Sequence, residues 1–322
     1  MSNKEKFYGV NESNWGHKWG YRDSGFKVNS DKSVTFTGKR YPICGKRLYN
    51  FIPFVEEILG VEFALEPKIK EVEKKHVSDP NINEPFMADL KESFDIDRFS
   101  GEHNERLLHS HGQHSTDEVY KVLYNKLDQF ADLVFYIESE EETVKLIDLA
   151  QKHNVCLIPY GGGTNVTNAL RPPKEERRMV VSVDTRRMAD VESIDEHNLM
   201  VTVGAGITGK VLEQELNKRG FTVGHEPDSY EFSTVGGWIS TNAAGMKKHK
   251  YGNIEDIVQN LRMVTPKGVI NQKRPLTRSS FGIKAQNVLF GSEGNLGIIT
   301  SATLKVHRLP ESSAYELSLI HI

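Results

Sequence analysis

The sequence is poor in cysteine, in long apolar runs and in net charge, and each shortage excludes a class of protein. Cys44 and Cys156 are the only cysteines among 322 residues, so no disulfide framework is expected and a reducing compartment is the default. No run approaches the roughly 18 apolar residues of a membrane span, and the opening MSNKEKFYGV is too polar to predict a secretory signal. A formal net charge of −3 gives no electrostatic reason to expect nucleic acid as a partner.

Three regions follow one another along the chain. Residues 1–127 begin with aromatic, Gly-rich and basic segments and, from about residue 88, carry Leu107, Val119 and Val122 at loose helical spacing. We therefore expect an N-terminal extension that is mainly helical. Residues 128–310 alternate strand and helix patterns and form the predicted main domain, and residues 311–322 follow it.

The main domain opens with strand and helix patterns that alternate. The buried strand patterns DLVFYI and VCLIPY flank a helix that Ser139 and Glu142 open as a capping box and that Asn154 ends. MVVSVD and NLMVTVGAG follow as strands, and Thr208 caps a second helix that Gly220 ends. An α/β arrangement of this kind binds its ligand at the ends of its strands.

Three consecutive glycines, Gly161 to Gly163, follow the strand VCLIPY directly. Ordering glycine costs about 0.5 to 1 kcal/mol more than ordering alanine in regular structure, so a side chain must be excluded here for a reason. Either the chain makes a tight turn, or its backbone N–H groups form a concavity for an anion such as a pyrophosphate. The segment lacks the patterns G-x-G-x-x-G and G-K-[ST], which points away from NAD and ATP.

Two further segments repeat this composition. Residues 224–253 gather small and hydroxyl side chains around Gly236 and Gly237, and residues 289–300 place three glycines around Glu293. Glycine-rich segments so far apart within one domain exceed what a single turn needs. We expect these loops to converge on one extended cofactor, which favours the concavity at the triple glycine.

At this point the motifs resemble a known family. P-x-GGGT-x-V, PDS-x-EFSTVGGW-x-ST with AGMKK and YGNIED, and GSEG-x-LG resemble the flavin-binding half of the alkyldihydroxyacetonephosphate synthases. These are FAD proteins of the vanillyl-alcohol oxidase type. WGYRDS, TGKRYP and AGITG resemble that family in particular, and the resemblance extends from about residue 14 to about residue 310.

The resemblance implies a fold, a cofactor and a set of contacts. The fold is α+β, with a vanillyl-alcohol oxidase type FAD-binding domain of two α/β subdomains behind the helical extension. FAD is bound non-covalently and no metal is expected. The residues that the resemblance implies as FAD contacts are Pro159, Tyr160, Gly161, Gly162, Gly163, Thr164, Asn165, Asp228, Ser229, Tyr230, Glu231, Phe232, Ser233, Thr234, Thr241, Asn242, Ala243, Ala244, Arg278, Glu293, Gly294, Asn295, Leu296, Gly297, Ile298 and Ile299.

The resemblance also implies a reaction. The family exchanges the acyl group of acyl-dihydroxyacetone phosphate for a long-chain fatty alcohol in ether-lipid synthesis, without net redox chemistry, at the peroxisomal membrane surface and as a homodimer. Its catalytic tyrosine and histidine-rich loop have no counterpart before Ile322, so residues 311–322 are expected to begin a missing cap and C-terminal region. We therefore expect a truncated chain, with unknown catalytic residues and little transferase activity of its own.

Several interpretations remain open. An FAD-linked dehydrogenase or oxidase of a 2-hydroxy acid such as D-lactate would share the glycine-rich loops, and an inactive FAD-binding fragment is a third possibility. His109, His111 and His114 are expected at a helix end or in packing rather than on a metal, because no Cys or carboxylate stands at ligand spacing. His225 is expected to have a structural hydrogen-bonding role, and Trp238 a place in the core.

Overall fold

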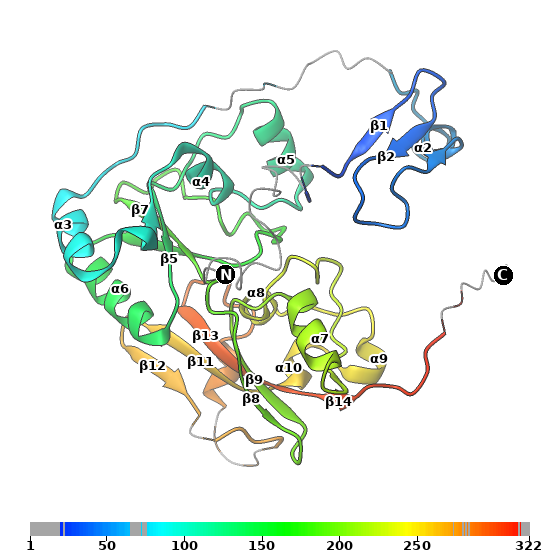
Figure 1. Cartoon of the computed structure of the whole chain (residues 1–322). Helices are drawn as coiled ribbons and strands as arrows, with labels where there is room; N and C mark the ends of the chain where they lie inside the picture. The colour runs from blue at the N-terminus through cyan, green and yellow to red at the C-terminus, as the bar shows by residue number, and fades with distance from the viewer. Residues whose placement is uncertain are drawn as a thin grey trace.

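The computed structural model of the chain describes residues 20–314, apart from residues 22, 65–71, 73–75, 273, 279, 281 and 283, together with residue 316. Part of the WGYRDS segment, and residues 315 and 317–322 of the predicted C-terminal region, lie outside the described residues. Two β-sheets with helices packed on them form the body, and a small three-stranded sheet with one helix lies at its side (Figure 1).

The first sheet of the body has the strand order β4-β5-β7-β6. Its strands are β4 (Phe99–Ser100), β5 (Leu133–Tyr136), β6 (Cys156–Tyr160) and β7 (Val180–Asp184). β5, β7 and β6 are parallel, whereas β4 pairs antiparallel with β5. β7 is buried along its whole length, as expected for an apolar strand covered on both faces. β6 and β7 end side by side at the pair Tyr160 and Asp184.

The second sheet is antiparallel throughout and has the order β12-β11-β13-β9-β8. Its strands are β8 (Val191–Asp195), β9 (Met200–Gly204), β11 (Val258–Thr265), β12 (Gly268–Asn271) and β13 (Ile298–Lys305). β10 (Phe221–Thr222) and β14 (His307–Arg308) form a short separate pair. The strands predicted from DLVFYI, VCLIPY, MVVSVD and NLMVTVGAG are confirmed as β5, β6, β7 and β9.

The two helices predicted in the main domain are confirmed as α6 (Glu140–Lys152) and α7 (Gly209–Asn217). The Ser139 side chain accepts a hydrogen bond from the Glu142 N–H at 3.1 Å, and Thr208 caps α7 in the same way. The Glu142 carboxylate accepts from the Glu138 N–H instead of that of Ser139, so the box is shifted by one residue. Shorter helices complete the main domain: α8 (Val235–Ser240), α9 (Lys248–Tyr251), α10 (Ile254–Ile257) and the 3-10 helix η3 (Ala285–Val288).

The two sheets of the body share a core along α6. One buried cluster surrounds the first sheet and includes Phe135, Leu146 and Val181, and it also takes in Val264 and Ile298 from the second sheet. α6 packs against β6 and also against β11 and β13, so it lies between the sheets. A second cluster joins α7, α8 and α10 to the second sheet.

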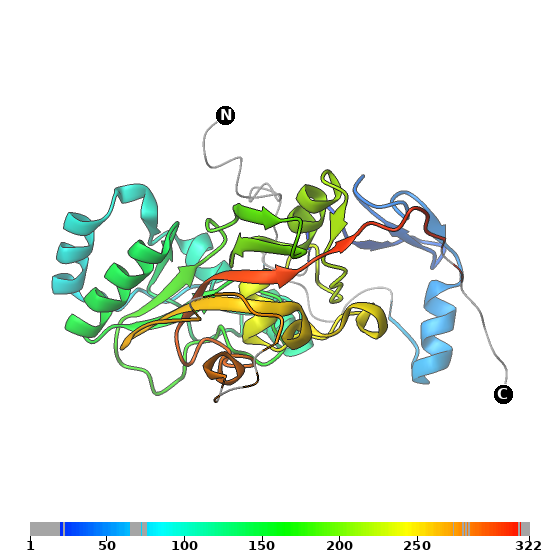
Figure 2. The ribbon, with the colours of Figure 1, turned by 90° about the horizontal axis from the view of Figure 1, so that it is seen from below.

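The N-terminal region contains a sheet that the sequence did not predict. Its strands β1 (Phe26–Val28), β2 (Val34–Phe36) and β3 (Arg47–Leu48) precede the helix α2 (Phe51–Leu59). Strands of two or three residues are too short to show an alternating pattern of apolar residues, so the sequence predicted only the helices of the extension. Figure 2, turned from Figure 1, again shows β1, β2 and α2 at one side of the body.

The remaining elements of the predicted extension are part of the body. They are α3 (Glu84–Ser93), the 3-10 helix η2 (Ile96–Arg98), α4 (His103–Leu108) and α5 (Thr116–Leu123). Phe86 and Leu90 of α3 are buried in the same core cluster as α6, and β4 extends the first sheet. The boundary expected at residue 128 therefore does not separate two packing units. Within the described ranges, no helix is both long and apolar enough to cross a bilayer.

Candidate functional site

Three loops from different parts of the main domain enclose a cavity of about 370 Å³. This volume is within the usual range of ligand pockets. The first loop follows β6, the second leads into and out of α8, and the third leads into β13. The cavity is lined by Pro159, Tyr160, Gly161, Gly162, Gly163, Thr164, Asn165, Val166, Thr167, Ala169, Leu170, Thr185, Pro227, Ser229, Ser233, Thr234, Gly236, Gly237, Trp238, Ser240, Thr241, Asn242, Ala243, Ala244, Glu293, Gly294, Gly297, Ile298 and Ile299.

The triple glycine presents unpaired backbone donors to this cavity. In the part of the chain that the structure describes, the N–H groups of Gly161, Gly162 and Gly163 have no acceptor. Gly162 and Gly163 are nevertheless buried, and a buried N–H without a partner is costly unless a ligand or water accepts from it. The segment therefore has the donors that an anionic group requires.

The protein atoms packed around the same three glycines explain why none of them carries a side chain. A Cβ on Gly161 would lie 2.5 Å from Thr234 Oγ1, and one on Gly162 would lie 2.2 Å from the Phe232 carbonyl oxygen. Gly163 has a φ of +68°, which favours glycine, and its Cβ would meet the Tyr160 hydroxyl at 2.5 Å. The two alternatives posed by the sequence are thus both present: the chain turns tightly against its neighbours, and its N–H groups remain available to a ligand.

Backbone contacts tie the third loop to the other two. The N–H groups of Gly291 and Glu293 donate to the carbonyls of Ile239 and Ser240, at 3.0 and 2.8 Å. A Cβ on Gly294, whose φ is +80°, would lie 3.0 Å from the Pro159 ring. The glycines of this loop therefore permit close approach of protein to protein, and the loop closes one wall of the cavity.

A buried ion pair supports the end of β6 from behind. Asp184 is completely buried, and its carboxylate accepts hydrogen bonds from Arg186 Nη2 at 2.6 Å and from His109 Nε2 at 2.9 Å. Burial alone would raise the pKa of Asp184, but the Arg186 guanidinium and the His109 hydrogen bond outweigh it and hold the pKa well below its usual range. The His109 ring lies 4.4 Å from that of Tyr160, which lines the cavity. The ion pair thus holds the residue from which the glycine loop starts.

The histidine-rich segment after α4 packs against the glycine loop, which sequence reasoning missed. The Gln113 N–H donates to the Gly163 carbonyl at 2.8 Å, and His114 makes a hydrogen bond to the Thr164 backbone. His109, His111 and Gln113 are all buried. Within the described residues, no group of three His, Cys, Asp or Glu side chains is placed to hold a metal ion. No signal in the sequence indicated this contact, because about fifty positions separate the two segments.

His225 does not have the structural hydrogen-bonding role that the sequence led us to expect. Its side chain is 1% exposed, yet neither ring nitrogen has a hydrogen-bond partner within the described part of the chain. The ring packs edge-on against Trp238, with 4.8 Å between ring centroids. Burial lowers the pKa of His225 to about 4, because the charged ring would lose its hydration without gaining a partner.

The buried His225 is expected to make the protein acid-sensitive above pH 4. Its folded pKa of about 4 lies below the unfolded value near 6.5, so its contribution to stability is complete above pH 6.5 and is lost as pH falls toward 4. The loss amounts to about 3 kcal/mol. Urea denaturation of wild type and His225→Phe at several pH values should show a shallower decline of the variant's unfolding free energy in this window. Parallel curves would contradict the assignment.

Most residues that the sequence predicted as FAD contacts line the cavity, and some do not. Pro159 to Asn165, Thr241 to Ala244, Ser229, Ser233, Thr234, Glu293, Gly294 and Gly297 to Ile299 are in its walls. The predicted residues outside its walls are Asp228, Tyr230, Glu231, Phe232, Arg278, Asn295 and Leu296. Arg278 is exposed. Thr185 at the end of β7 and Trp238 line the cavity without having been predicted to, because their sequence neighbourhoods resemble those of core residues.

Comparison with known proteins assigns the domain around this cavity. Residues 131–272 match the family described as FAD binding domain. Over 91% of its length the chain is 43% identical to alkyldihydroxyacetonephosphate synthase of Caenorhabditis elegans, of which it covers 49%. A solved structure of alkyldihydroxyacetonephosphate synthase matches 93% of the chain with a TM-score of 0.83 at 32% identity, and the chain covers 55% of it.

Two limits on this similarity matter for function. The chain spans about half the length of the synthases it matches. A weaker similarity extends to another kind of enzyme: D-lactate dehydrogenase [cytochrome] of Kluyveromyces lactis is 25% identical over 79% of the chain, and the chain covers 44% of that protein. The resemblance to the synthases is therefore confirmed at higher identity and over more of the chain than that to the dehydrogenase.

The cavity fits FAD, which is the cofactor of this domain. The unpaired N–H groups of Gly161 to Gly163 suit the negatively charged oxygens of its pyrophosphate. Hydrogen bonds to charged oxygens stabilise by about 1.5 to 3 kcal/mol each, so a few of them offset the ordering of three glycines. Gly236 and Gly237 of α8 and Ile298 and Ile299 of β13 add small and apolar surface to the wall, against which a flat ring system can pack.

Proposed function

We propose that the chain provides the FAD site for exchange of the acyl group of acyl-dihydroxyacetone phosphate for a long-chain fatty alcohol. The product, alkyl-dihydroxyacetone phosphate, is a precursor of ether lipids. The observation that carries this proposal is the 43% identity to the Caenorhabditis elegans synthase over 91% of the chain. The lower identity to D-lactate dehydrogenase does not favour the alternative, oxidation of a 2-hydroxy acid.

The cavity walls supply binding groups and almost no acid or base. Among the described lining residues only Tyr160 and Glu293 have ionisable side chains, and no His or Cys is present, which agrees with non-covalent binding of FAD. FAD, when bound, supplies the electron-accepting ring at which the substrate reacts. The chain's own contribution is to hold the pyrophosphate at Gly161 to Gly163 and to exclude water from the small-residue walls. Proton transfer during the exchange then requires groups outside these walls.

A chimera tests the proposed activity. Residues 20–310 of this chain replace the matching segment of the Caenorhabditis elegans synthase, and formation of the alkyl product from acyl-dihydroxyacetone phosphate and a labelled fatty alcohol is measured. The chimera is expected to form the ether product and to retain FAD. The same chimera with Gly162→Ala serves as the matched inactive control. A chimera that retains FAD but forms no ether product would count against the proposal.

Anaerobic reduction separates the proposal from its alternative. A 2-hydroxy-acid dehydrogenase transfers two electrons to its flavin, so D-lactate would bleach the absorbance near 450 nm, whereas the exchange reaction leaves the flavin oxidised overall. We expect no bleaching of the FAD-loaded chain by D-lactate or related 2-hydroxy acids. Stoichiometric bleaching would favour the dehydrogenase.

The location and partners of the chain follow from the same resemblance. We assign to it acyl-dihydroxyacetone phosphate and a fatty alcohol as substrates, the peroxisome as compartment, the peroxisomal membrane as surface, and a homodimer as assembly. Fractionation of cells that express the protein tests the compartment, and light scattering of the purified protein tests the assembly. Recovery in the cytosol as a monomer would contradict both assignments.

A further inference from the structure

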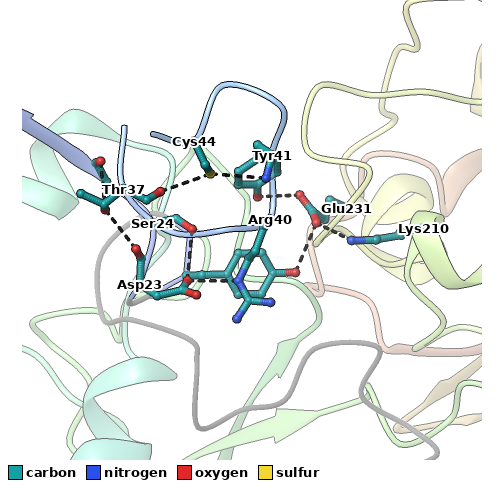
Figure 3. A network of polar contacts seen from close by, with 10 residues as sticks. Asp23, Ser24, Thr37, Arg40, Tyr41, Cys44, Lys210 and Glu231 are labelled. Atoms are coloured by element: carbon teal, nitrogen blue, oxygen red, sulfur yellow. Dashed lines mark hydrogen bonds and ion pairs between the residues drawn. The ribbon is translucent and has the colours of Figure 1, made fainter. Parts of the chain in front are cut away.

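Glu231 joins the N-terminal part of the chain to the loop that lines the cavity. We call residues 20–64, other than residue 22, the N-terminal unit, and residues 227–234 the cofactor loop. Glu231 Oε2 accepts a hydrogen bond from the Tyr41 hydroxyl at 2.9 Å, and Oε1 accepts from the Tyr21 hydroxyl at 3.2 Å and from Lys210 Nζ at 2.6 Å. Figure 3 shows Tyr41 and Lys210 pointing toward Glu231 from different elements. A residue expected to line the flavin is instead an anchor between two parts of the protein.

Contacts within the N-terminal unit restrict both tyrosine side chains independently of their hydrogen bonds to Glu231. The Arg40 guanidinium lies 4.0 Å from the centroid of the Tyr21 ring and pairs with Asp23 at 3.0 Å. The Cys44 thiol accepts a hydrogen bond from the Tyr41 N–H at 3.4 Å and donates to the Thr37 carbonyl at 3.3 Å (Figure 3). Because these contacts restrict both rings in advance, less side-chain entropy is lost when their hydroxyls bind the carboxylate.

Both phenols remain protonated at neutral pH. Burial and the Glu231 carboxylate raise the pKa of Tyr21 to about 12, and the same causes raise the pKa of Tyr41 well above its usual value. Each hydroxyl therefore donates to a charged acceptor, and hydrogen bonds of this kind are the stronger ones.

A direct path of contacts leads from this anchor to the glycine loop. Tyr21 is 4% exposed, and its ring packs on that of Phe232 with 5.3 Å between centroids. The Phe232 carbonyl oxygen lies 2.2 Å from the position that a Cβ on Gly162 would occupy. Ser229 and Ser233, on either side of the anchor, line the cavity. Movement of the N-terminal unit would therefore displace the wall against which Gly162 packs.

The two N-terminal segments that contact Glu231 have no role in lining the cavity. Tyr21 belongs to WGYRDS and Tyr41 to TGKRYP, and no described residue of either segment lies in the cavity walls. Both contact the Glu231 of the segment PDSYEFSTVGGW, which does.

We propose that the N-terminal unit positions the cofactor loop for FAD through Glu231, with Tyr21 and Tyr41 as positioning residues. The unit makes no contact with the cavity itself; it holds the loop that carries Ser229, Ser233 and the support of Gly162. FAD affinity and the docking of the N-terminal unit are consequently coupled, so each strengthens the other. The proposal rests on FAD binding alone and is independent of the transfer reaction.

Conservative variants of the whole chain test this coupling. Tyr41→Phe removes the 2.9 Å hydrogen bond without changing the ring, and it is expected to weaken FAD binding about tenfold, as measured by titration of flavin fluorescence. Tyr49→Phe is the matched control, because Tyr49 is on the same unit and is 62% exposed. The flavin absorption band of Tyr41→Phe at saturating FAD should also lose vibronic resolution, which general destabilisation of the apoprotein would not change.

A double-mutant cycle shows whether the effect passes through the anchor. Glu231→Gln alone should weaken FAD binding at least as much as Tyr41→Phe, and the double variant should add little to it. FAD should slow amide hydrogen exchange in residues 23–48 of wild type but not of Glu231→Gln. Unchanged FAD affinity in Tyr41→Phe and Glu231→Gln, or fully additive effects with equal exchange protection, would overturn the proposal.

Discussion

Replacing Gly162 with alanine is expected to remove FAD from the protein and to destabilise it by about 3 kcal/mol. The new Cβ would lie 2.2 Å from the Phe232 carbonyl oxygen and 2.8 Å from Ser233 Cα, and Cβ atoms do not approach other atoms this closely. Both obstacles are backbone atoms, so no side-chain rotation relieves them. The cofactor loop must move away from the glycine loop, and the wall of the cavity moves with it.

Alanine substitutions at two other glycines serve as graded comparisons for Gly162→Ala. At Gly161 the nearest atom to a new Cβ is the Thr234 hydroxyl at 2.5 Å, which can rotate at the cost of the cap that it forms on α8. At Gly101 no atom lies within 4 Å. We therefore expect Gly101→Ala to be silent and Gly161→Ala to lie between Gly101→Ala and Gly162→Ala.

The measurements are FAD affinity by fluorescence titration and unfolding free energy in urea. We expect FAD to bind more than a hundredfold more weakly, which corresponds to about 3 kcal/mol of binding free energy in addition to the loss of folding stability, so Gly162→Ala should be purified without yellow colour. Wild-type affinity in Gly162→Ala would mean that the two loops are not packed together as the structure shows.

A second large loss of folding stability is expected when Asp184 is replaced with asparagine. Replacement with asparagine keeps the shape of the side chain but removes the buried carboxylate that pairs with the Arg186 guanidinium, which is 4% exposed. Removing one partner of a buried ion pair costs about 3 to 5 kcal/mol. The amide also places N–H donors toward the donors of Arg186, and its single acceptor oxygen cannot replace both carboxylate oxygens.

The loss at Asp184 should extend to FAD affinity. Asp184 pairs with Tyr160 across β6 and β7, and Tyr160 precedes the glycine loop directly. Urea denaturation and FAD titration of Asp184→Asn therefore both report on the cluster. The exposed Asp148 on α6 supplies the control Asp148→Asn, for which no change is expected. A stable Asp184→Asn variant with normal FAD affinity would show that the ion pair does not support the site.

The pH dependence distinguishes this cluster from His225. The lowered pKa of Asp184 means that its contribution is present above the unfolded value near 3.9 and is lost only in stronger acid. The lowered pKa of His225 acts at higher pH, between about 6.5 and 4. Of these two groups, His225 is therefore the one expected to lower stability on mild acidification.

Local signals in the sequence predicted the elements of the main domain. Ser139 and Thr208 cap helices by hydrogen bonds to N–H groups three residues on, and such contacts depend on neighbours in the chain. The strands β5, β6 and β7 are short apolar runs because both faces of their sheet are covered. The three-stranded sheet of the N-terminal unit escaped prediction because its strands are too short to show a period.

The sequence identified the glycine-rich segments, but it predicted only one of the two reasons why glycine is required there. The sequence indicated a concavity for an anion at Gly161 to Gly163, and the structure adds that the side-chain positions of the same glycines are occupied by neighbouring protein atoms. Glu231 was predicted as a cofactor contact from its place in the motif. Its side chain points instead to two tyrosines about 200 positions away, which no local pattern can encode.

By itself the sequence predicted an α/β domain, and its motifs predicted a resemblance to the synthases, FAD as cofactor and glycine-rich loops as its contacts. The domain prediction depends on periodicity, capping and turn chemistry, which act between near neighbours. Only the tertiary structure decided which side chains meet: His109 with Asp184, Gln113 with Gly163, and Glu231 with Tyr21 and Tyr41. Such contacts are set when separate elements pack on a shared core, so distance along the chain says nothing about them.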